Sequence, residues 1–586
     1  MKKRLSGDFA LELPYTHGTV RLRRQGRTLL ASLQYQGAYG LGEKFDCFNH
    51  KGCRVVNQVE EKFCFQGEKT YCPAPFFWTD TGFGLYLDTC ETTVFTFGEK
   101  EILAELPCDA DVVAFSGSPE TIVREYMELF GQAKLPPEWI FGSWVSANRW
   151  NCQADVEALL EKLKTFHFPA SVVVLEAWSD EATFYLFNGA KAPPVPDGKP
   201  VPLETMDFSQ SPWPNPAGMI EQIHEAGLKL LLWQVPVYKQ QSAAELPNVQ
   251  NQLDRADAAA RRLCVTMPDG TPYTIPEGHW FSGSMVPDFT NPETVENWFS
   301  KRQYLLDLGV DGFKTDGGEF IYREDARFFD GSTGKTGVNR YARDYAQAYS
   351  RFVGAERVIF SRAGFSGQHT VPCHWAGDQQ SQNRELKSVL CAGLSAAASG
   401  ILFWGIDLAG FAGALPTLDL YRRATQMACF LPIMQWHSEP DGGQFRELMP
   451  GGEGNNERSP WNMAASYDCP GFLEEMRFWH QLHQRLRPYL FKTAQDCVQA
   501  GKPFLRPLVY EWPEDPSAVG CEDEYLLGED LLVAPLLEEQ AQSRRVYLPK
   551  GVWHDFFDGT KIEGGRTIIA GGNGKLPVFA RNGFSL

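Results

Sequence analysis

Eight apolar, strand-like segments that alternate with helical segments constrain the fold of this chain more than any other feature. The strand-like segments are Ile140–Val145, Ser171–Trp178, Leu228–Val235, Gly312–Asp316, Arg357–Arg362, Cys373–Asp378, Ile401–Asp407 and Leu431–His437. Amphipathic helices are expected between several of them, such as Ala154–Phe166 and Pro216–Gly227. Continuous apolar segments are typical of parallel strands that are buried on both faces, and eight β-then-α units are what a TIM barrel requires. We therefore predict an α/β fold built on a (β/α)8 TIM barrel, with a doubly wound sheet as the competing architecture.

Segments with the pattern of antiparallel strands flank the predicted barrel on both sides. The examples are Thr19–Arg24, Leu29–Tyr35 and Gly82–Asp88 before the barrel, and Tyr525–Ala534, Arg545–Leu548 and Leu576–Arg581 after it. Short alternating segments broken by Gly and charged turns are typical of β-sandwiches. A chain of 586 residues is also too long for a single hydrophobic core. We predict three domains: an N-terminal β-sandwich (1–135), the barrel (136–487) and a C-terminal β-domain (488–586).

Charge and cysteine usage exclude several function classes. The net charge of −18 argues against a nucleic-acid partner, because phosphate binding needs a basic surface. No run of 18 apolar residues predicts a membrane span, and no apolar stretch follows the basic N-terminus as it would in a signal peptide. The 14 Cys are scattered without CxxC pairs, which is typical of reduced thiols. We expect a cytoplasmic protein with no membrane association, metal or cofactor.

Acidic and aromatic residues follow the carboxyl ends of six predicted strands. These ends read Glu176–Asp180, Lys314–Glu319, Ser361-Arg362, Trp375–Gln379, Trp404–Asp407 and Gln435–His437. Catalytic groups of TIM barrels lie at the carboxyl ends of the strands, where the βα loops begin. The sequence therefore predicts that these side chains converge on one rim of the barrel.

Two aspartates on this rim, Asp316 and Asp378, suit glycoside hydrolysis. One carboxylate attacks the anomeric carbon, while the other protonates the leaving oxygen and then activates water. In a retaining enzyme the two groups lie roughly 5–5.5 Å apart. Gly317 and Gly377 stand next to them and would let a substrate approach the backbone closely. For either aspartate alone, the competing interpretation is a helix N-cap after a strand.

Five motifs, spread in order over nearly the whole chain, resemble glycoside hydrolase family 31, which contains α-glucosidases, α-xylosidases and relatives. Gly40–Asp46 resembles the loop that the N-terminal sandwich lends to the active site, and Pro287–Pro292 resembles the motif before the nucleophile strand. Gly312–Glu319 resembles the nucleophile motif, and Arg362 with Trp375–Asp378 resembles the acid/base region. Leu526–Pro535 resembles part of the proximal C-terminal β-domain.

The resemblance implies a retaining, exo-acting α-glycosidase with Asp316 as nucleophile and Asp378 as general acid/base. The residues expected to bind a small oligosaccharide or glycoside substrate are Glu176, Trp178, Asp180, Lys314, Arg362, Trp375, Asp407 and His437. Arg362 and His437 would bind sugar hydroxyls or support the carboxylates, Trp375 would form a wall of the pocket, and Asp407 would add a polar contact. We interpret Trp404 and Trp436 as barrel packing.

The sugar identity depends on positions where this chain departs from the family pattern. Many α-glucosidases of the family carry Asp at the end of the second strand, where this chain has Trp178, or Asp180 if the alignment shifts by two residues. Gln435 stands where an Arg is usual. We expect an α-glucosidase, with α-xylosidase, α-galactosidase or another specialised α-glycosidase as alternatives. A catalytically inactive sugar-binding protein on the same scaffold is the alternative from another class, and a homo-oligomer is left open.

Overall fold

A closed barrel of eight parallel strands forms the centre of the molecule. The computed structural model describes residues 1–107, 109–147, 150–438, 457–572 and 574–586. The barrel strands are β12 (Ser143–Ala147), β13 (Val172–Leu175), β14 (Lys229–Gln234), β15 (Gly312–Thr315), β16 (Val358–Ser361), β17 (His374–Trp375), β18 (Trp404–Asp407) and β19 (Ile433–Ser438). Neighbours pair in chain order, and β12 closes the barrel against β19. The eight predicted strands and the TIM barrel are confirmed, and the doubly wound alternative is wrong.

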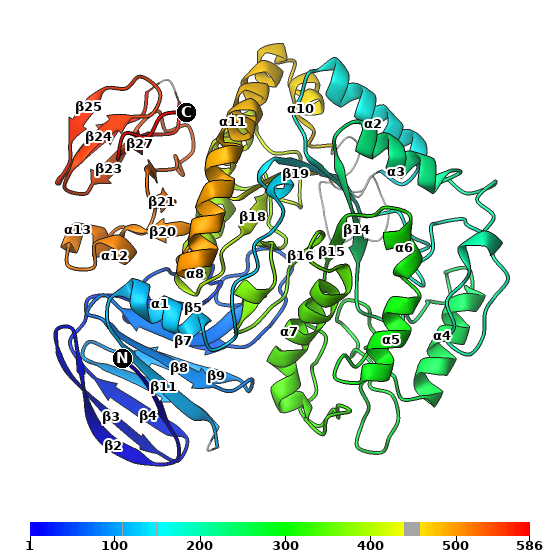
Figure 1. Ribbon diagram of the computed structural model, residues 1–586, viewed down its shortest axis with the longest axis horizontal. Coiled ribbons are helices and arrows are strands. Elements are labelled where there is room, and N and C mark those ends of the chain that lie inside the picture. The colour runs from blue at the N-terminus through cyan, green and yellow to red at the C-terminus, as the bar shows by residue number, and fades with distance from the viewer. Residues whose placement is uncertain (108, 148–149, 439–456, 573) are drawn as a thin grey trace.

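Helices surround the barrel strands (Figure 1). They are α2 (Gln153–Thr165), α3 (Pro216–Glu225), α4 (Val249–Ala260), α5 (Pro292–Ser300), α6 (Gln303–Asp307), α7 (Gly334–Val353), α8 (Asn383–Ala398), α9 (Leu418–Ala428), α10 (Pro460–Ser466) and α11 (Pro470–Ala500). The two helices expected from the sequence are α2 and α3. Asn215 begins α3 by accepting a hydrogen bond from the N–H of Gly218, and Pro216 follows at the first helical position. Among the described residues, no helix combines the length and apolar character that a membrane span requires.

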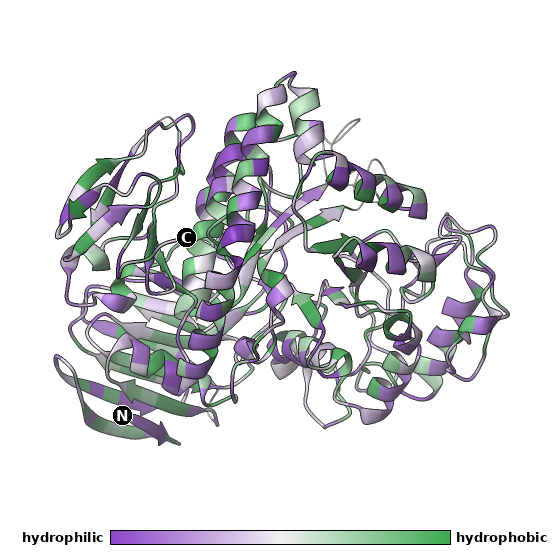
Figure 2. Cartoon of the chain, turned by 45° about the horizontal axis from the view of Figure 1, so that its top comes forward, coloured by the Kyte–Doolittle hydropathy of each residue, from purple (hydrophilic) through white to green (hydrophobic). Residues whose placement is uncertain are grey.

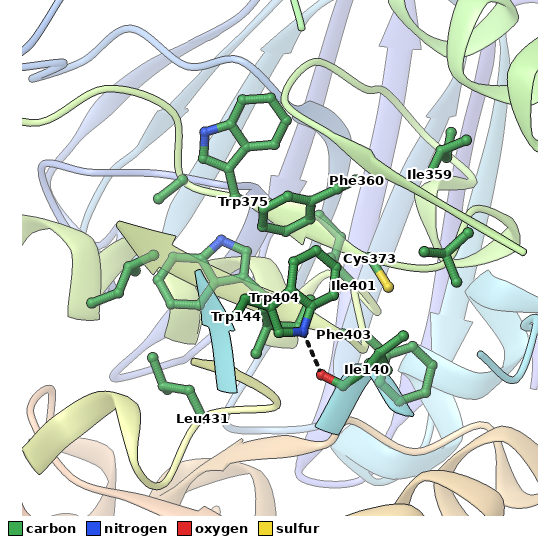
Figure 3. Packing of buried hydrophobic residues seen from close by; sticks show 14 of the residues in the cluster. Ile140, Trp144, Ile359, Phe360, Cys373, Trp375, Ile401, Phe403, Trp404 and Leu431 are labelled. Atoms are coloured by element: carbon green, nitrogen blue, oxygen red, sulfur yellow. Dashed lines mark hydrogen bonds between the residues drawn. The ribbon is translucent and has the colours of Figure 1, made fainter. Parts of the chain in front are cut away.

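The barrel interior is filled by large side chains instead of forming a pore. Figure 3 shows Trp144, Phe360, Trp375 and Trp404 packed within one cluster. The rings of Trp144 and Trp375 lie 4.9 and 5.0 Å from Phe360, and the indole N–H of Trp144 donates to the Ile140 carbonyl at 2.8 Å. Trp404 is buried here, which agrees with its interpretation as packing; Trp436 is buried elsewhere in the same core.

The N-terminal region is a sandwich of two antiparallel sheets. One sheet has the order β1 (Lys2–Leu5), β11 (Asp111–Ser116), β8 (Phe83–Asp88), β7 (Pro73–Thr79) and β5 (Ala38–Gly42). The other has the order β2 (Phe9–Tyr15), β3 (Gly18–Gln25), β4 (Thr28–Ser32), β10 (Glu101–Glu105), β9 (Thr93–Phe97) and β6 (Arg54–Asn57), and α1 (Pro119–Met127) follows the sandwich in the chain. Alternate residues of β3 are buried, as the sequence pattern predicts. Strand β5 packs on α8, where Ser395 Oγ donates to the Gly40 and Gly42 carbonyls at 2.9 and 2.8 Å.

The C-terminal β-domain lies on the same side of the barrel as the sandwich (Figure 1). One sheet has the order β20 (Leu505–Pro507), β21 (Tyr525–Leu527), β22 (Leu531–Val533), β27 (Val578–Ala580), β24 (Val552–Asp555) and β25 (Lys561–Glu563); β23 (Arg544–Leu548) pairs with β26 (Arg566–Ala570), and two short helices, α12 (Leu508–Glu511) and α13 (Pro516–Val519), complete the domain.

Two details of the predicted organisation differ from the structure. The segment Tyr525–Ala534, for which we predicted a β pattern without a turn, is a hairpin of β21 and β22, because Gly528 turns the chain with a φ of 63°. We placed the boundary between the barrel and the C-terminal domain between residues 487 and 488, and this boundary falls inside helix α11. Hydrophilic and hydrophobic residues are interspersed along the long helices of the molecule (Figure 2). In α11 the apolar residues Met476, Leu482, Leu486 and Leu490 belong to the buried core.

Candidate active site

A cavity of about 930 Å³ opens at the carboxyl ends of the barrel strands. The lining residues that follow barrel strands include Glu176, Asp316, Arg362, Asp378 and Phe411. Lys314 and Trp233, the penultimate residues of β15 and β14, also line the cavity. The opposite wall comes from the N-terminal sandwich, through residues 58–61, 63 and 69. Trp280, Phe281 and Tyr322 add aromatic surface from the long βα loops. The rim predicted from the strand ends therefore exists, and a second domain closes it.

Asp316 follows β15 and is held by two hydrogen bonds and one ion pair. The indole N–H of Trp233 donates to Oδ2 at 2.9 Å, and the N–H of Gly317 donates to Oδ1 at 2.8 Å. Arg362 Nε lies 3.2 Å from Oδ1. No described helix begins directly after Asp316, since α7 starts at Gly334 with Thr333 as its cap, so the N-cap interpretation does not apply.

Asp378 follows β17 and contacts the same guanidinium. Arg362 Nη1 donates to Asp378 Oδ2 at 3.2 Å. Burial, reinforced by the charges of Asp316 and Glu61, holds the pKa of the Asp378 carboxyl well above its usual range, although Arg362 and Lys314 oppose this. A carboxyl group that keeps its proton at neutral pH can serve as a general acid. Because Arg362 touches both aspartates through neighbouring nitrogens, the two carboxylates face one small space.

Two glutamates complete the shell around Arg362. Glu319 accepts from Nε and Nη2, both at 3.1 Å, and Glu61 Oε1 accepts from Nη2 at 3.1 Å. The guanidinium is buried, and its face lies 4.7 Å from the ring centroid of Tyr71. Arg362 is thus fixed by charge and by aromatic contact from two domains.

Glu176, Lys314 and His437 form a second charged group in the same cavity. Lys314 Nζ donates to Glu176 Oε1, and His437 Nε2 lies 2.7 Å from the same oxygen. Burial alone would raise the pKa of Glu176, but Lys314 and His437 outweigh it and lower the pKa to about 2. Glu176 and Lys314 line the cavity, whereas His437 is buried behind them.

Two more of the predicted substrate-binding residues, Trp375 and Asp407, are buried beneath the cavity. The Lys314 ammonium lies 4.7 Å from the centroid of the Trp375 ring, and Gln435 donates to Asp407 Oδ1. Neither Trp375 nor Asp407 is among the lining residues of the empty cavity. The structure therefore places both one layer below the charged groups.

Trp178 and Asp180 lie outside the cavity. Trp178 is fully buried, and its indole N–H donates to the carbonyl of Trp233 at 3.0 Å. Asp180 accepts from the N–H groups of Ala182 and Thr183 at 3.2 and 2.9 Å, which folds the loop after β13. The direct substrate contact that we predicted for these two residues is not what the geometry shows, because their polar groups are satisfied by the protein.

The glycines beside the aspartates serve the protein's own packing. Gly377 has a φ of 72°, and a Cβ there would lie 2.3 Å from the ring of Tyr71; a Cβ on Gly317, also with a φ of 72°, would lie 2.7 Å from the ring of Phe320. We predicted that these positions admit the substrate. In the structure they admit aromatic side chains.

Sequence reasoning missed Trp233 and Glu61. Trp233 is the penultimate residue of the third barrel strand, and an aromatic donor near a strand end is a signal that could have identified it. Glu61 carries no such signal, because it lies 301 residues from Arg362 in the sequence. The motif Gly40–Asp46 was expected to reach the active site; instead Glu43 accepts from the indole N–H of Trp404 at 2.7 Å. Residues 58–61, 63 and 69 of the sandwich line the cavity, and Tyr71 contacts Arg362.

One group of residues within the described ranges has spacing that could hold a metal ion. It consists of Cys521, Asp523 and Glu524 in the C-terminal domain, away from the cavity. The guanidinium of Arg544 lies 2.7 Å from Asp523 and 3.4 Å from Glu524, so these two carboxylates are already paired with a positively charged side chain.

Three family models match the chain. They are described as the glycosyl hydrolases family 31 TIM-barrel domain (residues 133–493), the family 31 C-terminal domain (501–584) and the family 31 N-terminal galactose mutarotase-like domain (24–95).

Two curated relatives are each 34% identical to this chain. The match to the isomaltosyltransferase of Sporosarcina globispora covers 93% of this chain and 50% of the relative. The match to the 1,3-α-isomaltosidase of Kribbella flavida covers 92% and 75%. This chain therefore spans half the length of the first relative and three quarters of the second.

Solved structures of similar proteins bind oligosaccharides. The cycloalternan-forming enzyme from Listeria monocytogenes, in complex with a pentasaccharide substrate, superposes with a TM-score of 0.91 at 32% identity and covers 99% of this chain and 58% of its own. The cycloalternan-degrading enzyme from Trueperella pyogenes superposes with a TM-score of 0.89 at 34% identity, covering 96% and 82%. A further structure of that enzyme contains a covalent intermediate.

Proposed function

This chain belongs to glycosyl hydrolase family 31, and we propose that it is a retaining α-glucosyl hydrolase or transferase that acts on isomaltosyl units of α-glucan oligosaccharides. The observation that carries the proposal is the placement of Asp316 and Asp378 on neighbouring nitrogens of the single guanidinium of Arg362. Such a short-range carboxylate pair suits a double displacement, in which one group attacks and the other moves protons.

In the first step, Asp316 attacks the anomeric carbon and the bond to the leaving oxygen breaks. Asp378 gives its proton to that oxygen, so the leaving sugar departs as a neutral alcohol. The raised pKa of Asp378, caused first by burial, suits this acid role. Trp233, Gly317 and Arg362 hold the Asp316 carboxylate in one orientation for attack.

In the second step, the Asp378 carboxylate takes a proton from the incoming acceptor. The acceptor oxygen then attacks the anomeric carbon and releases Asp316. Water as acceptor gives hydrolysis, and a sugar hydroxyl gives transfer. Both outcomes occur by name among the relatives, as an isomaltosidase and an isomaltosyltransferase.

Glu176 and Lys314 are the polar groups that we assign to the hydroxyls of the sugar in the cleaved unit. Both line the cavity at its barrel side, close to Asp316. His437, Trp375 and Asp407 support them from below, and Trp178 braces the backbone of Trp233. For Trp178 this supporting role replaces the direct contact that we expected, whereas Asp180 folds the loop after β13.

The size of the cavity supports a unit larger than one glucose. Pockets of roughly 300–1,000 Å³ hold drug-sized ligands, and this cavity measures about 930 Å³. It therefore has room for more than a single pyranose ring. Its aromatic surface at Trp280, Phe281 and Tyr322 offers faces on which the C–H surfaces of further sugar rings can stack.

Product analysis tests the proposed specificity. We expect incubation with cycloalternan to yield isomaltose or isomaltosyl-transfer products, and aryl α-isomaltosides to be cleaved faster than aryl α-glucosides. Maltose and aryl α-xylosides and α-galactosides serve as comparison substrates. Glucose as the first product, with aryl α-glucosides as the faster substrates, would identify a plain α-glucosidase instead. Turnover of the xyloside or galactoside alone would favour the corresponding alternative, and no turnover at all would favour a sugar-binding protein.

A further inference from the structure

A segment of the N-terminal sandwich enters the catalytic centre. Residues 58–71 follow strand β6, and several of them line the cavity opposite the barrel strands. Glu61 Oε1 accepts a hydrogen bond from Arg362 Nη2 at 3.1 Å. Tyr71, from the same segment, lies against the face of that guanidinium. The sandwich thus contacts the guanidinium of Arg362, which touches both Asp316 and Asp378.

The charges around Arg362 do not balance. Four carboxylates, those of Glu61, Asp316, Glu319 and Asp378, lie within 3.2 Å of its nitrogens. Lys314, the other buried cation nearby, is already paired with Glu176. Carboxylates that share one cation repel one another, so the group as a whole retains a proton that isolated carboxyls would release at neutral pH.

We propose that Glu61, which comes from the N-terminal sandwich, is a positioning residue of the catalytic centre and acts on Asp378 through Arg362. Arg362 donates to Glu61 through Nη2 and to Asp378 through Nη1, two nitrogens of the same planar guanidinium. The contact with Glu61 therefore helps to fix the orientation of that plane, and with it the direction in which Nη1 donates to Asp378. This inference rests on the proposed function, because the acid role of Asp378 is assigned there.

The negative charge of Glu61 also favours the protonated form of Asp378. The titratable groups that face this cluster are Asp316, Glu319, Lys314 and Arg362 from the barrel, Tyr322 from the loop after β15, and Tyr71 from the sandwich. Burial raises the pKa of Glu61 to about 7, although Arg362 opposes it, so part of its charge is present at neutral pH. Removing this charge makes the loss of the Asp378 proton easier.

The test is the pH profile of kcat/KM for the wild type and for Glu61→Gln. Glutamine keeps the shape of the side chain and an oxygen that can accept from Arg362, but it removes the charge. The basic limb, where the general acid loses its proton, should move to lower pH by about one unit, which is the order expected for one charge at this range. In Glu61→Asp, which keeps the charge, the basic limb should lie close to its wild-type position.

Glu68→Gln is the matched control, because Glu68 belongs to the same segment but is exposed and does not line the cavity. Its profile should superpose on that of the wild type. An unmoved basic limb in Glu61→Gln, whatever its kcat, overturns the inference, since a purely structural role would scale activity equally at all pH values. If the glutamine variant does not fold, Glu61→Ala supplies the same comparison. A wild type without α-glycosidase turnover would instead contradict the proposed function itself.

Discussion

At the scale of single residues, the site depends on charged side chains that are buried against partners of opposite charge. Glu176 shows this most clearly, since Lys314 and His437 both contact its Oε1 and Ser146 Oγ approaches the same oxygen at 3.4 Å. A buried carboxylate is expensive unless such partners surround it. Removing the charge of Glu176 would leave Lys314 as an uncompensated ion in the core, and removing the charge of Lys314 would do the same to Glu176. The group is therefore expected to contribute to stability as well as to sugar binding.

Glu176→Gln tests this contribution. The folded-state pKa of Glu176, about 2, lies below the roughly 4.3 of an unfolded glutamate, so its stabilisation is present above pH ~4.3 and is lost as the pH falls towards 2. At pH 7 the variant, which leaves the charge of Lys314 unpaired, should lose about 3 kcal/mol of unfolding free energy. The difference in thermal unfolding midpoint between the wild type and Glu176→Gln should become smaller below pH ~4.5.

Glu475→Gln provides the control for this comparison. Glu475 pairs with Arg422 at 2.6 Å, but both side chains are about one-third exposed. Exposed ion pairs contribute roughly 0–1 kcal/mol, so its unfolding midpoint should barely change. If the difference in unfolding midpoint between the wild type and Glu176→Gln is the same at pH 7 and pH 3, the ion pair of Glu176 is not what stabilises the protein.

At the scale of elements, short strand ends and loops from two domains meet at close range. Strand β17 has two residues, His374 and Trp375, and the chain then turns at Gly377 to present Asp378. The ring of Tyr71, from the sandwich, occupies the space where a side chain at position 377 would lie. The position of Asp378 therefore depends on a contact between the barrel loop and residues 58–71.

Gly377→Ala tests that contact. The new Cβ would lie 2.3 Å from the Tyr71 ring, and the φ of 72° is unfavourable for alanine. We expect a loss of about 2–3 kcal/mol in stability and a fall in kcat of at least about tenfold, because the loop that carries Asp378 must shift. Gly471→Ala, at the start of α11, meets nothing within 4 Å and should leave both quantities unchanged. Wild-type kcat and stability in Gly377→Ala would show that the loop yields without moving Asp378.

The elements also show which parts of the structure a sequence can predict. The eight barrel strands were predictable because strands buried on both faces are continuously apolar. The strand ends identified the rim because parallel strands end on one side of a barrel. The side-chain directions after β13 were not predictable: Trp178 and Asp180 are two and four residues beyond Glu176, yet the loop turns both away from the cavity.

At the scale of the whole molecule, the catalytic centre belongs to two domains. The barrel supplies Asp316, Asp378 and Arg362, and the sandwich supplies Glu61 and Tyr71. Contacts of this kind connect residues about 300 positions apart, and they depend on how one domain docks on another. A pattern read along the chain carries no signal for them. The cytoplasmic location stays a prediction, and whether the protein is a homo-oligomer stays open.

The most direct test of the central claim is to trap the covalent intermediate and find the residue that carries it. The wild type is incubated with a 5-fluoro-α-glucosyl fluoride or its isomaltosyl counterpart, digested, and analysed by mass spectrometry. The glycosyl group should be found on the peptide that contains Asp316, and Asp316→Ala should remain unlabelled. A label on Glu176, Glu319 or Asp378, or turnover of α-glucosides without any adduct, would contradict the assignment of Asp316 as the nucleophile.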